Sequence, residues 1–276
     1  MRVLELFHKY REQKRLNRAK RARVVEVTAT FGTILAFKDD LITHQIREFG
    51  AHTRPEVAFL LSVLEGGDKV FDIGAHIGTF AIPMAQKIGR AGRLLAVEGD
   101  AANFDLLVQN IARNGLSEVV NPRHALIAPA DSAYSASYVN KNTSGTFFVP
   151  NTGSQTIPQY SLDALAAAAF QPDVIKIDIE GMECLALSDS SMVAERKPIL
   201  YVEVSESHLS RYGGSIGSLD SMLRKLDYRL FRNVAPRNAA NDHFEARELN
   251  TLTEGGAFFD VLALPPTSPR LSRLTL

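Results

Sequence analysis

The chain has 276 residues, of which 45% are hydrophobic, so it can bury a full core as one large α/β domain with an N-terminal extension. Lys and Arg together number 31, as do Asp and Glu, so net charge gives no reason to expect a nucleic-acid partner. The single cysteine, Cys184, excludes an intrachain disulfide, and no apolar run is long enough to span a bilayer. We therefore expect a cytoplasmic protein.

Residues 1–65 are predicted to form an N-terminal extension. Residues 1–24 are rich in Lys and Arg and have apolar side chains at helical spacing, which predicts a short amphipathic helix. Its basic face suits an anionic membrane surface or RNA, but a solvated helix packed on the domain is the favoured interpretation. A β-branched stretch broken by Gly32 predicts a hairpin over residues 24–37, and helices are predicted up to Gly50 and over residues 55–64.

Residues 70–98 form the pattern around which the rest of the chain is organised. A short apolar strand runs into a glycine turn, a helix follows over residues 81–88, and a second strand over residues 93–97 ends on Glu98. A strand, turn, helix, strand and acid in this order build an adenosine site in α/β proteins. The acid can accept hydrogen bonds from both ribose hydroxyls.

The spacing of this turn selects the ligand. A dinucleotide turn has a second glycine that admits a pyrophosphate, but His76 stands at that position. The turn is instead Asp72-x-Gly74-x-x-x-Gly78, which suits an adenosine ligand without a phosphate, namely S-adenosylmethionine (SAM). We therefore predict that Asp72, Gly74, His76, Gly78 and Glu98 bind this cofactor.

The remainder alternates strands with helices. Helices are predicted over residues 101–113, 162–169, 183–187 and 218–226, and strands over residues 119–125, 173–179, 198–204, 228–231 and 258–264. This alternation predicts a doubly wound, mostly parallel, seven-stranded Rossmann-like sheet over residues 66–264, with a Pro- and Ser-rich tail over residues 265–276. The long polar segment 127–160 is predicted to be a functional insertion that helps form the acceptor site or its lid.

Acidic residues follow the later strands, where ligands of open α/β sheets bind. Asp178 and Glu180 end the fourth strand, and acids are costly there unless they are paired or functional. We predict that Asp178 orients or deprotonates an acceptor, with Glu180 and His208 as helpers; pairing of Asp178 with Lys176 is the structural alternative. No H-x-x-x-H or C-x-x-C spacing occurs, so we predict no metal, although Asp178, Glu180 and Glu203 have the oxygen ligands that Mg²⁺ prefers.

Three runs in this chain resemble the FkbM family of SAM-dependent methyltransferases: residues 71–78, residues 97–104 and the more specific K-I-D-x-E-G-x-E run over residues 176–183. Ser161-Leu162-Asp163 also falls where the family has it. The resemblance covers residues 40–264 and implies a class I methyltransferase that O-methylates sugars or secondary metabolites. His76 replaces the usual Asn, and Gly99 replaces the usual Pro after the ribose acid and joins the predicted cofactor residues.

The predicted function is therefore SAM-dependent O-methylation of a hydroxyl on a small molecule or glycan. One alternative is methylation of nucleic acid or protein, but the N/D-P-P-Y/F motif of amino-methylating enzymes is missing after the fourth strand. A catalytically silent SAM-binding scaffold is a second alternative. A nicotinamide oxidoreductase is a third, disfavoured by His76. The sequence leaves the acceptor and the oligomeric state open.

Overall fold

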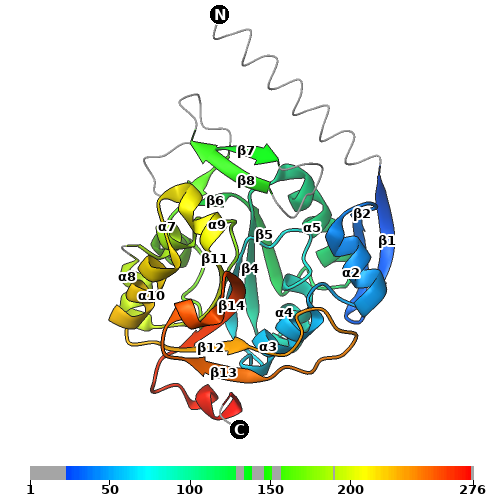
Figure 1. Ribbon diagram of the computed structural model, residues 1–276. Helices are drawn as coiled ribbons and strands as arrows, with labels where there is room; N and C mark the ends of the chain where they lie inside the picture. Colours follow the sequence, from blue (N-terminus) through cyan, green and yellow to red (C-terminus); the bar gives the residue numbers. More distant parts are fainter. Residues whose placement is uncertain (1–22, 129–133, 139–145, 151–156, 189, 275–276) are drawn as a thin grey trace, which may run out of the picture.

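The computed structural model describes residues 23–128, 134–138, 146–150, 157–188 and 190–274. Their centre is a sheet with the strand order β13-β12-β14-β11-β10-β3-β4-β5 (Figure 1). Neighbouring strands from β5 to β11 pair in parallel, whereas the pairs β11–β14, β14–β12 and β12–β13 are antiparallel. The bounds are β3 Lys69–Ile73, β4 Arg93–Glu98, β5 Val120–His124, β10 Val174–Ile177, β11 Ile199–Ser205, β12 Arg229–Asn233, β13 Ala246–Leu249 and β14 Phe258–Leu264.

The doubly wound, mostly parallel sheet is confirmed, but it has eight strands among the described residues instead of the predicted seven. The additional strand is β13, which lies at the edge and pairs with β12. Its sequence, Ala-Arg-Glu-Leu, lacks β-branched residues and apolar alternation, so no local pattern marks it as a strand. Pairing with β12, including an ion pair between Arg229 and Glu248 at 2.7 Å, places it in the sheet.

Helices cover both faces of the sheet because neighbouring residues of each buried strand point to opposite faces. Val70 belongs to a core beneath α3, α4 and α5, whereas Phe71 belongs to a second core beneath α6, α7, α8 and α10. The two groups of helices lie on opposite sides of the sheet in Figure 1. The bounds are α2 Leu41–Phe49, α3 Arg54–Ser62, α4 Ala81–Ile88, α5 Ala101–Arg113, α6 Leu162–Ala168, α7 Glu183–Leu187, α8 Ser191–Arg196, α9 Glu206–Leu209 and α10 Ile216–Lys225.

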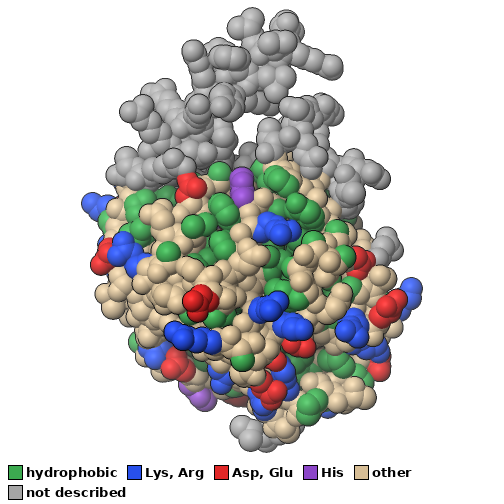
Figure 2. Space-filling model, turned by 180° about the vertical axis from the view of Figure 1, so that it is seen from behind, with side chains coloured by type: hydrophobic (Ala, Val, Ile, Leu, Met, Phe, Trp, Pro, Cys, Tyr) green, Lys and Arg blue, Asp and Glu red, His purple; other side chains and the backbone are tan. Residues whose placement is uncertain are grey.

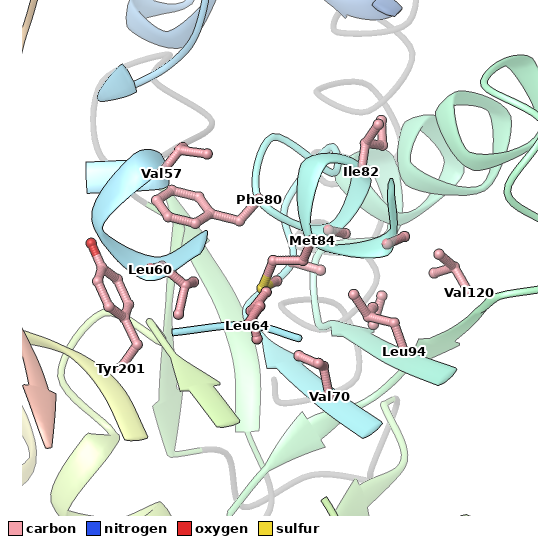
Figure 3. Close-up of a cluster of buried hydrophobic side chains, with 14 of the residues drawn as sticks. Val57, Leu60, Leu64, Val70, Phe80, Ile82, Met84, Leu94, Val120 and Tyr201 are labelled. Atoms are coloured by element: carbon pink, nitrogen blue, oxygen red, sulfur yellow. The ribbon is translucent and has the colours of Figure 1, made fainter. Parts of the chain in front are cut away.

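The first core joins the N-terminal extension to the sheet. In Figure 3, Leu60, Met84 and Val70 lie around Leu64, and all four belong to one buried cluster. These side chains come from α3, the loop that follows it, β3 and α4. Burying each large aliphatic side chain contributes about 1.5–3 kcal/mol, so this cluster is a main source of the extension's attachment.

The extension follows its prediction where it is described. The predicted hairpin forms as β1 Val24–Ala29 and β2 Gly32–Phe37. The side chain of Asn110 on α5 accepts from the Leu35 N–H at 2.7 Å and donates to the Leu35 carbonyl at 2.9 Å, which ties the hairpin to the core. The helix predicted over residues 1–24 lies outside the described residues, apart from the last two.

The end of the chain packs back on the body. Residues Pro269–Arg273 form a short 3-10 helix, and Arg270 donates to the Asp68 carboxylate at 2.7 Å and 2.8 Å. Leu271 and Leu274 are buried in the first core. The described part of the segment predicted as a tail is therefore part of the folded body.

A small antiparallel hairpin, β7 Tyr134–Tyr138 and β8 Thr146–Pro150, lies at the opposite end of the molecule from the C-terminus (Figure 1). The Tyr212 hydroxyl donates to the Phe148 carbonyl at 2.5 Å and accepts from the Phe148 N–H at 3.0 Å. These two bonds fix β8 to the short 3-10 helix Ser210–Tyr212, which follows α9. In the described part of the chain, every helix is too short or too polar to cross a membrane.

Candidate active site

A cavity of about 540 Å³ opens at the carboxyl ends of β3, β4, β10 and β11. Its wall combines the glycine turn after β3, Glu98 and Gly99 after β4, and Asp178 and Glu180 after β10. This is the position where open α/β sheets bind ligands. The volume is in the range of small-molecule sites in proteins.

The glycine turn is constrained by its contacts within the protein. Gly74 has a φ of +82°, and a Cβ there would lie 1.8 Å from the Asp178 carbonyl oxygen. A glycine is required here because the backbone that follows β10 approaches this position closely. His76 also has a positive φ, 51°, and its backbone N–H donates to Glu98 at 2.8 Å. The turn therefore sets the distance between β3 and the acids that follow β10.

Glu98 is held between the glycine turn and the start of α5. One carboxylate oxygen accepts from the His76 N–H at 2.8 Å, and the other accepts from the Asp100 N–H at 2.7 Å. Burial raises the pKa of Glu98 to about 7, although the two N–H donors oppose the shift. Each oxygen of a carboxylate has two lone pairs, so both can still accept a hydroxyl hydrogen bond from a ligand in the cavity.

Asp72 and Gly78, which were also predicted to bind the cofactor, are not on the cavity wall. Asp72 is fully buried within β3, where its Oδ1 lies 3.1 Å from Nζ of Lys176 on β10. Lys176 Nζ also donates to the Gly74 carbonyl at 3.2 Å. Burial opposes the charge on Lys176, but Asp72 and Asp178 raise its pKa, so Lys176 stays cationic. Asp72 therefore reaches the turn only through Lys176.

Gly99 makes room for the β7–β8 hairpin. A Cβ on Gly99 would lie 2.3 Å from Leu126 and 2.6 Å from the Phe148 ring. Phe148 and Leu126 both line the cavity beside Glu98. Ile127 and Phe148, which belong to the predicted insertion over residues 127–160, therefore form part of the cavity wall near Gly99.

The predicted catalytic residues converge on the other end. Asp178 is 35% exposed, and its Oδ2 lies 3.6 Å from Lys176 Nζ. His208 Nδ1 lies 3.0 Å from a Glu203 oxygen and 3.3 Å from a Glu180 oxygen. Asp178, Glu180, Glu203 and His208 all line the cavity. The structure thus brings His208 into contact with an acid from β11, Glu203, and with an acid that follows the neighbouring strand β10, Glu180.

This cluster is electrostatically crowded. Burial, and then the Glu203 and Asp178 carboxylates, raise the pKa of Glu180 to about 9. Burial, followed by the Asp178 and Glu183 charges, raises the pKa of Glu203 well above its usual range. Among the described residues, Glu180, Glu203 and His208 also have ligand-type atoms within 4.8 Å of one another, close enough to hold a cation. The oxygen set considered from sequence contained Asp178 in place of His208.

Two further acids of the family motif have structural contacts. Glu183 accepts from the Ile179 N–H at 2.9 Å and the Gly181 N–H at 3.2 Å, so it fixes the turn after β10. Asp163 accepts from the Ser191 and Met192 N–H groups, so it caps α8.

Several cavity residues were missed from the sequence. His52, from the extension, and Arg237, from the loop after β12, lie on the wall, and burial followed by the positive charge of Arg237 lowers the pKa of His52 to about 3. Leu41 and Phe258, 54% and 50% exposed, are also on the wall. None of these four belongs to a local motif, so no sequence signal could have identified them.

The fold and this cavity define a doubly wound α/β domain with a site for a small molecule at the carboxyl ends of its strands. The family model described as the methyltransferase FkbM domain matches residues 72–230, and the chain belongs to this family. The resemblance found in the sequence is thereby confirmed.

Curated relatives match parts of the chain. Hexuronic acid methyltransferase AglP from Haloferax volcanii is 29% identical over 151 residues, which make up 54% of this chain and 60% of AglP. Ribosomal protein L11 methyltransferase from Desulforamulus reducens is 34% identical over 28% of this chain and 25% of that enzyme. The chain thus spans less than two thirds of the length of these relatives.

Two solved structures of methyltransferases are weakly similar to this chain in fold. TYW2 from M. jannaschii, in complex with AdoMet, is 14% identical, with a TM-score of 0.44 over 87% of this chain and 84% of that one. Precorrin-6y C5,15-methyltransferase from Geobacter metallireducens is 15% identical, with a TM-score of 0.44 over 76% of this chain and 87% of that one.

Proposed function

We propose that this protein transfers a methyl group from SAM to a hydroxyl of a sugar or glycan. The observation that carries the proposal is the placement of Asp178 and His208 in the same cavity as the glycine turn and Glu98. On this proposal, the proton acceptor and the acid that binds the ribose face the same cavity. The similarity to a hexuronic acid methyltransferase supports a sugar as the acceptor.

The residues at one end of the cavity fit the cofactor. Glu98 has acceptor capacity for the ribose hydroxyls, and Leu126, Ile127 and Phe148 offer an apolar surface to the adenine ring. When bound, SAM supplies an electrophilic methyl group with a good leaving group. The protein then has to position the acceptor in line and remove its proton.

The other end suits a sugar. Leu41 and Phe258 expose apolar surface at the cavity, and an aromatic ring can pack against the C–H face of a pyranose. Polar groups of Asp178, Arg211 and Arg237 also lie on the wall. A mostly apolar wall with a small number of polar groups in fixed positions is typical of small-molecule sites.

The distribution of charge disfavours a nucleic-acid acceptor. On the face seen in Figure 2, Lys and Arg side chains are interspersed with Asp and Glu, so that face has no single-sign basic patch for a phosphate backbone. Net formal charge is also zero.

The test is methyl transfer from isotope-labelled SAM to a panel of acceptors. The panel contains uronic-acid oligosaccharides, neutral glycans, rRNA fragments and ribosomal protein L11. We expect label on a glycan oxygen, located by mass spectrometry. Label on RNA or protein alone would overturn the proposal.

Asp178→Asn tests the site itself, because this change keeps shape and hydrogen bonding but removes the charge. Loss of an orienting or proton-accepting carboxylate should lower kcat by about 10²–10⁴-fold at unchanged affinity for S-adenosylhomocysteine. A near-normal kcat would exclude Asp178 from both roles.

A further inference from the structure

We propose that His208 accepts the proton of the acceptor hydroxyl and that Glu203, with Glu180, is the positioning residue that holds its imidazole. This inference rests on the proposed function. In this proposal His208 accepts the proton and Asp178 only orients the hydroxyl. Glu203, which was not among the predicted catalytic residues, positions His208.

The first support is the anchoring of one ring nitrogen. His208 Nδ1 lies 3.0 Å from Glu203 and 3.3 Å from Glu180. Burial raises the pKa of both acids, so the pair holds a proton, and the carboxylate oxygen that stays unprotonated accepts from Nδ1–H, which favours the tautomer with the hydrogen on Nδ1. The lone pair then resides on Nε2, the nitrogen that is free to take up a proton. An acid that fixes a histidine tautomer in this way also stabilises the imidazolium that forms.

Second, Glu203 and His208 are both held in place by packing and by the sheet. Glu203 is buried in β11, which pairs with β10 on one side and β14 on the other. The backbone of His208 is held as well, because a Cβ on Gly181 would lie 2.1 Å from the His208 carbonyl oxygen. The imidazole also lies edge-on to Phe258, with ring centroids 6.1 Å apart. A proton acceptor held to within a fraction of an ångström is what in-line transfer requires.

The third support is the charge around the two candidates. Asp178 Oδ2 lies 3.6 Å from Lys176 Nζ, so the carboxylate is already engaged by a cation, whereas His208 Nδ1 is engaged by acids. The charged groups that face His208 are Glu203, Glu180 and, beyond them, Arg211, whose Nη1 lies 3.9 Å from Glu180. Two carboxylates so close share a proton readily, and the other then accepts the Nδ1 hydrogen.

The reaction combines a methyl transfer with a proton transfer. The acceptor oxygen forms a bond to the methyl carbon while the carbon–sulfur bond breaks and its electron pair remains on sulfur. The hydroxyl proton passes to Nε2 of His208, and the imidazolium later loses it to solvent through the cavity. The step requires no metal ion and no redox partner.

The experiment compares His208→Gln and Glu203→Gln with His243→Gln and Glu195→Gln, which change exposed residues outside the cavity. We expect kcat to fall about 10²–10⁴-fold in His208→Gln, the usual value of a general base. Glu203→Gln should lower kcat by about 10²-fold and alter the shape of the kcat–pH profile. Both controls should match the wild type, and S-adenosylhomocysteine affinity should stay within about twofold throughout.

A second readout needs no acceptor. Long-range ¹H–¹⁵N spectra report the tautomer of each histidine, and the signal missing in His208→Gln identifies His208. We expect the Nδ1–H tautomer in the wild type and its loss in Glu203→Gln. If the wild type methylated no glycan, the proposed function would fail, while these spectra would still decide how His208 is held.

Three results would overturn the inference. One is a kcat in His208→Gln within threefold of wild type. Another is the same His208 tautomer in Glu203→Gln as in the wild type. The third is loss of activity in EDTA with recovery in Mg²⁺ or Mn²⁺, which would make Glu180, Glu203 and His208 ligands of a cation instead.

Discussion

Glu98 accepts backbone hydrogen bonds from both sides of the turn it occupies, so its position is set before any ligand arrives. Glu98→Ala should weaken binding of S-adenosylhomocysteine by about 1–3 kcal/mol, the usual cost of leaving hydrogen-bond partners unpaired. Titration calorimetry measures this loss directly. Tighter binding of NAD than of S-adenosylhomocysteine by the wild type would overturn the cofactor assignment at Glu98.

The same carboxylate gives binding a pH signature. Its pKa of about 7 in the free protein means that it is protonated below pH 6 and ionised above pH 8. Ribose hydroxyls donate best to the ionised form, so affinity should rise between pH 6 and pH 8 and then level off. Glu98→Ala should abolish this rise, which makes the variant its own control.

At the scale of elements, the contact between β8 and the turn after β4 is the least expected. Phe148 packs where Gly99 lacks a side chain, and Tyr212 holds the strand there through two hydrogen bonds. Phe148→Ala should lower S-adenosylhomocysteine affinity by about 1–2 kcal/mol, because the ligand loses part of an apolar cover. Titration calorimetry measures this affinity in Phe148→Ala and in the control Val149→Ala. Val149 is the neighbouring residue, and its side chain is exposed.

Equal affinities in those two variants would show that the hairpin does not cover the cofactor. The predicted role of residues 127–160 as a lid would then be restricted to the acceptor.

At the scale of the whole molecule, we propose that the N-terminal extension and the methyltransferase core unfold together, although the sequence separates them at residue 65. The buried amide of Asn110 bonds to Leu35 in the extension and to the Ile77 carbonyl in the core. Asn110→Ala should lower the free energy of unfolding by about 1–3 kcal/mol because it leaves buried backbone groups unpaired. Urea unfolding followed by circular dichroism should still show one transition.

Gln109→Ala is the matched control, since Gln109 is exposed on the same helix and bonds only within it. Two separate transitions in the wild type would instead support an independent extension.

The sequence alone was sufficient for most of the order of strands and helices, the cofactor and the family. These depend on local signals: apolar periodicity, the spacing of Asp72, Gly74 and Gly78, and an acid at a strand end. Helix boundaries at residues 81–88 and 101–113 match the prediction because caps such as Asp100, which accepts from two N–H groups at 2.9 Å, are local as well.

Only the tertiary structure decided what the individual side chains do. Asp72 turned out to pair with Lys176, since the register of β3 against β10 sets them side by side. Glu203 meets His208 because α9 folds back over the end of β11. The register of neighbouring strands and the path of a loop depend on contacts between residues far apart in sequence, which no local pattern records. For the same reason only the folded sheet shows that Arg237, from the loop after β12, and Phe258, at the start of β14, lie on the cavity wall.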